Sequence, residues 1–151
     1  DGLLNFYQID FSSKEQELLK KFLAFTNWPT DNNFPYASGA SSELSNKFMD
    51  IGEMGITITA NGFYGPQGRE LRIPLKDSNL NNRFSNFQWD GLKITNYEME
   101  TSALYGLSNA LGHQACTICA IIANRFTQTY SKNYHKTIED LIQQVLERLT
   151  S

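Results

Sequence analysis

The chain has 151 residues, of which 40% are hydrophobic and 19% are charged, and its formal net charge is −3. This balance excludes an intrinsically disordered chain, and two cysteines are too few for a disulfide scaffold. No apolar run approaches the roughly 20 residues that span a bilayer. The 13 basic and 16 acidic side chains form no basic stripe for nucleic acid. We therefore expect a soluble globular domain without membrane or nucleic-acid partners.

Helix and strand signals alternate from the start of the chain. Ser12 or Ser13 opens a Ser-x-x-Glu capping box, and the apolar spacing after it predicts a helix to about Phe25. A loop rich in Pro and Asn is expected over residues 27–36, followed by a short helix over 41–49.

The middle of the chain contains the first strand signal. Residues 54–60 alternate and are β-branched, which predicts a strand that leads directly into a Gly-rich loop over 61–69. A helix is predicted over 80–89 and a very short strand over 94–96.

The last third continues the alternation. Helices are predicted over 98–111, with Gly112 as the C-cap, and over 137–149. The continuous apolar run over 115–123 predicts a buried parallel strand. The alternation predicts the α/β class with a mainly parallel sheet, although a doubly wound sheet usually has about five or six strands and few are visible here.

Two cysteines lie inside the last apolar run. Cys116 and Cys119 form a C-x-x-C pair, but no second Cys or His pair exists to complete a zinc site. Their small and β-branched neighbours favour buried structural thiols over redox or metal chemistry. Thiols in a core predict a reducing, cytoplasmic compartment and no metal site.

The first chemically interesting segment is the loop GFYGPQGRE over residues 62–70. Phe63 offers a stacking face, Gln67 a donor and an acceptor, and Arg69 a permanently charged fork of donors. Together these groups suit a flat heterocycle that presents carbonyls with an N–H between them, as uracil does. A Gly- and Pro-rich surface turn with an ion-paired arginine is the alternative interpretation.

Two further segments follow. Glu98 and Glu100 flank Met99 at a predicted strand-to-helix junction, where they could bind sugar hydroxyls while the methionine packs against the sugar. Acidic residues are also favoured there by the helix dipole, without any function. Arg125 follows the apolar run over 115–123, a place that suits either a ligand contact or a buried ion pair.

The motifs FYGPQGR over 63–69, NYEME over 96–100 and IANR over 122–125 occur in this order. Their joint occurrence resembles the uridine phosphorylases of the nucleoside phosphorylase superfamily. The resemblance extends along the whole chain and is strongest from Gly62 to Arg125. It implies a three-layer α/β/α fold.

The resemblance also implies roles for the residues that would bind the base. Phe63 would contact the ring, Gln67 would pair with N3–H and O2 of uracil, and Arg69 would donate to O4. Ile122 would line the base pocket. Arg125 would order the loop that carries Gln67 and Arg69, or would reach O4 through a water.

On the sugar side, Glu100 would hold the ribose 2′-hydroxyl, with Met99 beside the sugar and Glu98 in support. Gln67, Arg69 and Glu100 would be the catalytic residues. The implied reaction is phosphorolysis of uridine to uracil and ribose 1-phosphate, with inorganic phosphate as co-substrate and no other cofactor or metal.

Two alternatives remain beside this function. Purine-specific relatives carry an aspartate near the position of Asn124 and Arg125, and its absence favours pyrimidines over a purine or broad specificity. The other alternative is an inactive or partial chain that binds nucleoside without turnover.

The phosphate-binding motifs of this family belong to its N-terminal half and are not found in the sequence. Residues 1–151 are therefore expected to form the C-terminal part of a single phosphorylase domain, with the phosphate-binding half upstream of Asp1. Activity is expected only with that half, in a homo-oligomer that the family resemblance suggests is a hexamer.

Overall fold

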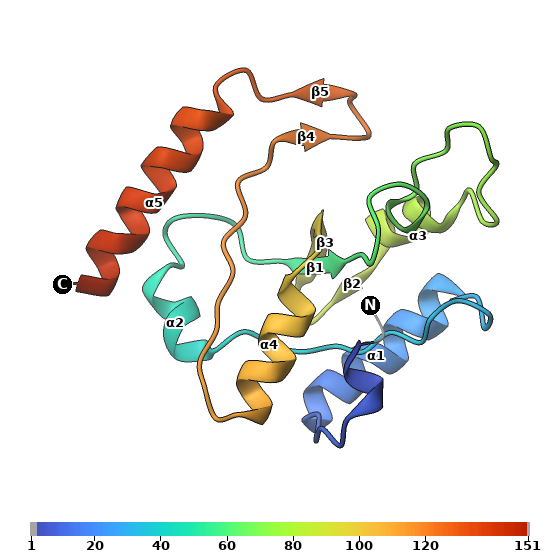
Figure 1. Ribbon diagram of the computed structural model, residues 1–151, viewed down its shortest axis with the longest axis horizontal. Helices are drawn as coiled ribbons and strands as arrows, with labels where there is room; N and C mark the ends of the chain where they lie inside the picture. The colour runs from blue at the N-terminus through green and yellow to red at the C-terminus, as the bar shows by residue number, and fades with distance from the viewer. Residues whose placement is uncertain (1–2, 151) are drawn as a thin grey trace. The chain divides into compact units, whose positions relative to one another are not determined.

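The computed structural model describes residues 3–150, which divide into two compact units (Figure 1). The first unit contains residues 3–39 and 55–115, and the second contains residues 40–54 and 116–150. Asp1, upstream of which the phosphate-binding half is predicted, lies outside the described residues. Helices and small β-sheets occur together, so the predicted α/β class is confirmed.

The first unit holds a three-stranded sheet with helices around it. Its elements in chain order are η1 (Leu3–Phe6), α1 (Ser13–Thr26), β1 (Ile56–Thr59), η2 (Gly65–Gln67), α3 (Leu80–Asn86), β2 (Gln88–Trp89), β3 (Leu92–Glu98) and α4 (Thr101–Ala110).

Helix α1 begins with the predicted capping box. The Ser12 hydroxyl accepts a hydrogen bond from the Glu15 backbone amide (3.3 Å), and the Glu15 carboxylate accepts one from the Ser12 amide (2.7 Å). These two bonds satisfy amides that would otherwise lack a partner at the helix start. Asn27 ends the helix in a left-handed conformation, with φ of 48°.

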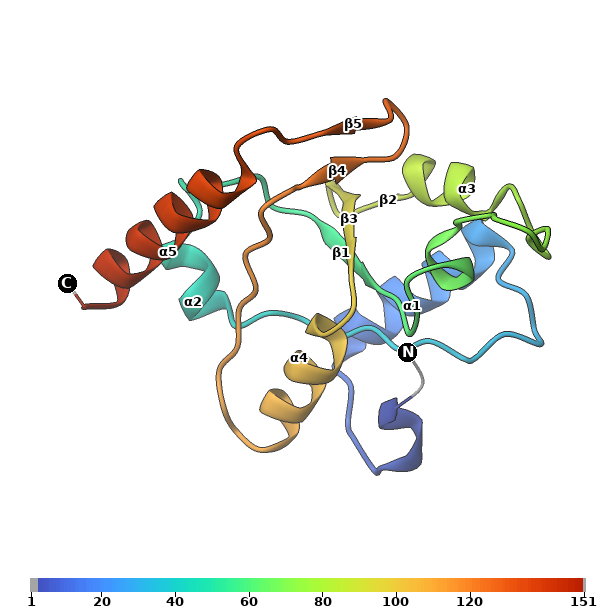
Figure 2. The same cartoon turned by 45° about the horizontal axis from the view of Figure 1, so that its top comes forward.

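The sheet has the order β1-β3-β2, and β3 runs parallel to β1 and antiparallel to β2 (Figure 2). Asp90 and Gly91 join β2 to β3, and both have positive φ, at 52° and 78°. Positive φ at both central residues is the geometry of the tight turn that joins two twisted antiparallel strands, and Asp-Gly is a preferred sequence for it. The parallel pairing brings the carboxyl ends of β1 and β3 together, with Thr59 opposite Glu98.

Aromatic side chains from α1, α3 and the residue that joins α3 to β2 form the core of the first unit. Phe22, Phe84 and Phe87 are all buried, and Phe22 packs against Phe87 edge to face with ring centroids 5.5 Å apart. The surrounding apolar side chains from α1 and the sheet include Ile56 and Ile58 of β1. This core fixes the sheet against α1 and α3, and so fixes the loop that follows β1.

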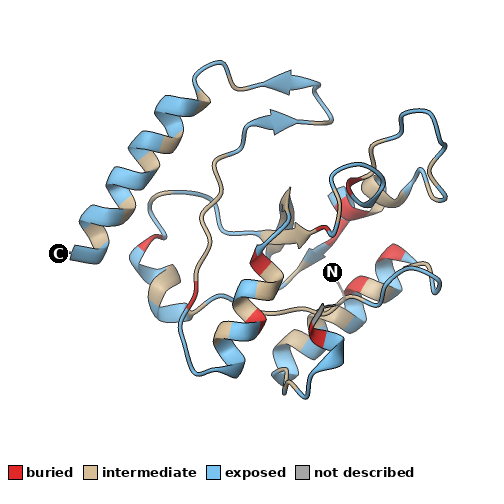
Figure 3. Cartoon of the chain, in the orientation of Figure 1, coloured by how far each residue is buried: buried red, intermediate tan, exposed pale blue. Residues whose placement is uncertain are grey.

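The second unit is built differently. Its elements are α2 (Ser42–Lys47), β4 (Ala123–Asn124), β5 (Thr129–Tyr130) and α5 (Tyr134–Thr150). Strands β4 and β5 pair antiparallel as a two-stranded sheet, and none of the residues of α5 is buried (Figure 3).

Several predicted boundaries differ from the structure. The helix predicted over 80–89 ends at Asn86, because the tight turn that follows requires its flanking residues to be strands. Because the same turn pairs β2 with the start of β3, the strand predicted over 94–96 is longer and covers the seven residues of β3. The helix predicted from residue 98 begins at Thr101, since Glu98 is the last residue of β3.

The prediction of a buried parallel strand over 115–123 is wrong. Residues 113–122 form neither helix nor strand, and Ile121 is 55% exposed. In the described part of the second unit, the strands are the short antiparallel β4 and β5, so no parallel ladder partner is present for this run. Cys116 and Cys119 are consequently half-buried, where a core position was expected. Arg125 follows a two-residue antiparallel strand instead of a central parallel one.

Candidate active site

The loop over residues 62–70 follows β1 and closes as a tight turn. The backbone amides of Gln67 and Arg69 both donate to the carbonyl of Tyr64, at 3.0 and 2.9 Å, and the amide of Gly68 donates to Gly65 (2.8 Å). Gly68 has φ of 71°, and a Cβ there would lie 2.0 Å from Nδ2 of Asn81. Both the left-handed backbone and the close neighbour require glycine at this position.

This turn brings Phe63, Gln67 and Arg69 together. The guanidinium carbon of Arg69 lies 3.5 Å from the centre of the Phe63 ring, a close cation–π contact. Nη1 of Arg69 also donates to Oε1 of Gln67 (2.9 Å) and to the carbonyl of Phe63. Gln67 is only 4% exposed, whereas Phe63 is 52% exposed. An aromatic ring, an amide and a guanidinium therefore meet at one place, where the Phe63 ring is about half exposed and carries the guanidinium on one face.

The carboxyl ends of β1 and β3 meet the amino end of α4. The Thr59 hydroxyl donates to the Glu98 carboxylate, which also accepts from the backbone amides of Glu100 (2.7 Å) and Thr101 (2.6 Å). The Thr59 oxygen in turn accepts from the amide of Ser102 (3.0 Å). Glu98 and Thr59 therefore cap α4 and occupy the amides with which a helix start would otherwise hold an anion.

These contacts set the protonation of Glu98. Partial burial is the largest single influence and raises its pKa, but the hydrogen bonds from Thr59 and from the residues that open α4 outweigh it. The net effect is a pKa below the ordinary value for glutamate. Glu98 is thus a carboxylate at neutral pH whose oxygens are engaged in capping.

Glu100 has a different environment. Its carboxylate accepts a hydrogen bond from the backbone amide of Met99 (3.2 Å), and both residues are exposed. The two glutamates that look alike in the sequence therefore differ: Glu98 holds the helix start, and Glu100 faces solvent beside Met99. An exposed carboxylate can accept hydrogen bonds from hydroxyl groups of a ligand.

Ile122 and Arg125 belong to the second unit. The carbonyl of Ile122 accepts from the amide of Ser131 (2.8 Å), and the Ile122 side chain is 41% exposed. Arg125 is half-buried in the turn between β4 and β5, where Asn124 Oδ1 accepts from the amide of Phe126 (3.0 Å). The predicted action of Arg125 on the 62–70 loop stays a prediction.

Three side chains near the site were not predicted. Thr59 could have been found, because it ends the alternating strand that precedes the loop. Asn81 contacts the loop from α3, and Tyr97 of β3 contacts Asn81. Neither carries a sequence signal, since these contacts depend on how the elements pack.

Within residues 3–150, no three His, Cys, Asp or Glu side chains are grouped so that they could hold a metal ion. No helix within this range combines the length and the apolar character that crossing a bilayer requires.

Comparison with known proteins gives one family. The family model for the phosphorylase superfamily matches residues 7–151. The uridine phosphorylase of Thermococcus kodakarensis is 38% identical over 85 residues, which are 52% of this chain and 28% of that protein. The uridine phosphorylase of Haemophilus influenzae is 32% identical over 80 residues, 50% of this chain and 29% of that protein. The matched segments thus span less than a third of either relative, and no solved structure gives a significant match.

Proposed function

This chain belongs to the phosphorylase superfamily, and from that premise we propose that it supplies the base- and ribose-binding part of a uridine phosphorylase. The observation that carries the proposal is the meeting of Phe63, Gln67 and Arg69 in one glycine-dependent turn. Both relatives are uridine phosphorylases, which supports uridine as the substrate.

The base is recognised by the loop. Because Arg69 donates to Oε1 of Gln67, the oxygen of that amide is directed toward the guanidinium. Uracil placed against the exposed part of Phe63 would receive hydrogen bonds from Gln67 at O2 and from Arg69 at O4, while the Gln67 oxygen accepts from N3–H. A guanidinium and an amide placed in this way match two carbonyls with an N–H between them.

Catalysis follows from where charge develops. Phosphate attacks C1′ of the ribose, the bond from C1′ to N1 of uracil breaks, and the electron pair of that bond moves into the ring. Negative charge grows on O2 and O4, where Gln67 and Arg69 donate, so their hydrogen bonds strengthen in the transition state. Uracil then takes a proton at N1, and ribose 1-phosphate is the second product.

The ribose is held at the amino end of α4. Glu100 accepts from the 2′-hydroxyl and carries negative charge near the positive sugar of the transition state, with Met99 packed beside it. Glu98 supports this arrangement by fixing the start of α4. Since Glu98 and Thr59 occupy the amides of that helix start, we do not place the phosphate there.

The phosphate site and the assembly remain predictions from the family resemblance. We expect phosphorolysis only when this chain acts together with an N-terminal phosphorylase half, in a cytoplasmic homo-oligomer. The short span of the matches favours one second candidate, a partial chain that binds nucleoside without turnover.

A substrate panel tests the proposal. The chain, alone and mixed with an N-terminal phosphorylase half, is incubated with phosphate and uridine, thymidine, inosine or adenosine, and the free base is quantified. We expect uracil to be the fastest product and Arg69→Ala to lower its rate by about 10²–10³-fold. Faster release of hypoxanthine or adenine would contradict pyrimidine specificity. Binding of uridine without release of any free base would favour the partial chain.

A further inference from the structure

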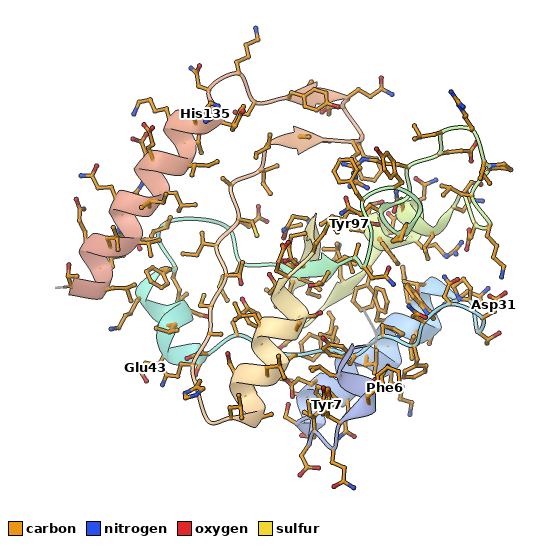
Figure 4. The ribbon with its side chains drawn as sticks, in the orientation of Figure 1. Phe6, Tyr7, Asp31, Glu43, Tyr97 and His135 are labelled. Atoms are coloured by element: carbon orange, nitrogen blue, oxygen red, sulfur yellow. The ribbon has the colours of Figure 1, made fainter. Side chains whose placement is uncertain are left out.

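The loop that carries Gln67 and Arg69 is held by Asn81, which is itself held by Tyr97, and neither side chain takes part in the proposed chemistry. Nδ2 of Asn81, on α3, donates to the backbone carbonyl of Gln67 (3.4 Å). The hydroxyl of Tyr97, the β3 residue labelled in Figure 4, donates to Oδ1 of the same asparagine. Asn81 therefore links the loop to the sheet.

The direction of the Asn81 amide follows from its two partners. A carbonyl of Gln67 can only accept, so it selects the nitrogen of Asn81, and the oxygen is left to face the tyrosine hydroxyl. The backbone of Gly68 also lies against this amide, because an added Cβ there would collide with it. Asn81 is thus in contact with the turn at two consecutive residues.

Tyr97 is itself fixed by the sheet and the core. It pairs with Ile58 in the parallel ladder, and its ring lies 6.2 Å from that of the buried Phe84. Its neighbour Glu98 caps α4 beside Glu100. Consecutive residues of β3 therefore organise both parts of the site, the base loop through Tyr97 and the ribose end through Glu98.

We propose that Asn81 is a positioning residue for base recognition. Tyr97 fixes the orientation of the Asn81 side-chain amide, and Asn81 in turn holds Gln67 and Arg69 in place for the pyrimidine. This inference rests on the proposed function. Its consequence is specific: loss of the Asn81 contact loosens the turn over 67–69 and weakens the binding of uracil, while the fold keeps its core.

Two readouts separate this role from a merely structural one. Hydrogen exchange measures how fast the backbone amides of Gln67, Gly68 and Arg69 open to solvent. All three amides donate hydrogen bonds within the turn. Calorimetry reports the affinity for uracil. The variants are Asn81→Ala, which removes both contacts, and Asn81→Asp, which keeps an acceptor for Tyr97 but cannot donate to Gln67. Asn82→Ala, at an exposed position of the same helix, is the matched control.

In Asn81→Ala and Asn81→Asp we expect the three amides to exchange at least about tenfold faster and uracil to bind about tenfold more weakly, with a cooperative unfolding transition retained. Tyr97→Phe, which keeps the ring, is expected to show a smaller change in the same direction. The Asn82→Ala control is expected to match the wild-type chain in both readouts. If Asn81→Ala does not fold, Asn81→Asp and Tyr97→Phe decide the outcome.

Unchanged exchange at the three amides in Asn81→Asp would overturn the inference, whatever happens to uracil. Faster exchange with unchanged uracil affinity would also overturn it, because Asn81 would then hold the loop without positioning it for the base. Wild-type chain that binds no uracil would contradict the proposed function, and with it the positioning role; the exchange data would then assign Asn81 to loop structure alone.

Discussion

Each of the two units contains a long amphipathic helix, but the apolar faces of these helices are buried to very different extents. Helix α1 of the first unit buries Phe22 in an aromatic core with Phe84 and Phe87. Helix α5 of the second unit has no buried residue, and its Leu146 is 55% exposed. Among the described residues of the second unit, Phe48 is the single buried hydrophobic side chain. An amphipathic pattern therefore shows that a face requires burial, but it does not provide the surface that buries it.

The same contrast applies to the predicted site. Phe63, Gln67 and Arg69 share a turn that is fixed by neighbours of the first unit. Arg125, by contrast, lies in a hairpin of the second unit that is built from two-residue strands. The loop that carries Phe63, Gln67 and Arg69 follows β1, whose Ile56 and Ile58 pack on the aromatic core, which implies that this core organises the base site.

The largest effect should come from the core itself. Phe87→Ala removes a side chain that is 2% exposed, and we expect it to lower the free energy of unfolding by about 3–5 kcal/mol. Phe126→Ala, at a position that is 68% exposed in the second unit, is the matched control and should change it by less than about 0.5 kcal/mol. Chemical denaturation measures both, and equal losses would remove the distinction between the units.

Next in size is the turn glycine. Gly68→Ala places a Cβ in a left-handed conformation and against Asn81, so we expect a loss of about 2 kcal/mol. Gly65→Ala, in the same loop, has no atom within 4 Å of the added Cβ and serves as the control. Thermal denaturation compares them, and a harmless Gly68→Ala would show that this turn is not held as described.

A smaller effect is expected at the cap of α4. Glu98→Gln should lower the free energy of unfolding by about 1 kcal/mol at neutral pH, since a charged cap is replaced by a neutral one. Because the pKa of Glu98 is lowered in the folded chain, its contribution is present above the ordinary glutamate pKa of about 4.3. That contribution is lost as the pH falls through the lowered folded-state value. Unfolding curves from neutral pH to acid should therefore converge for wild type and variant, and parallel curves would contradict this role.

The smallest effect should lie in the second unit. Arg148 donates to the Asp50 carboxylate (2.6 Å) and lowers the pKa of this exposed group. We expect Asp50→Asn to change the melting temperature less than Glu98→Gln does, and the difference to vanish near about 1 M salt because exposed ion pairs are screened. A change that persists at high salt would indicate a buried role for this pair.

The sequence predicted features that depend on neighbours in the chain. The capping box at Ser12 and the strand that ends at Thr59 are local, and both are present. The Gln67 turn was recognisable because its glycines and its spacing are local too. The run over 115–123 was misassigned because a strand needs a partner, and hydrophobicity alone does not show whether one is there. Asn81 and Tyr97 were missed for the same reason, since their contacts join α3, β3 and the loop.

The central claim is that the 62–70 loop recognises a pyrimidine through Arg69. Calorimetric titration of uracil into the wild-type chain and into Arg69→Ala tests this claim most directly. We predict that the wild-type chain binds uracil and that Arg69→Ala binds it about 10- to 100-fold more weakly, as expected for loss of a charged donor. Equal affinity of the two chains for uracil would contradict it.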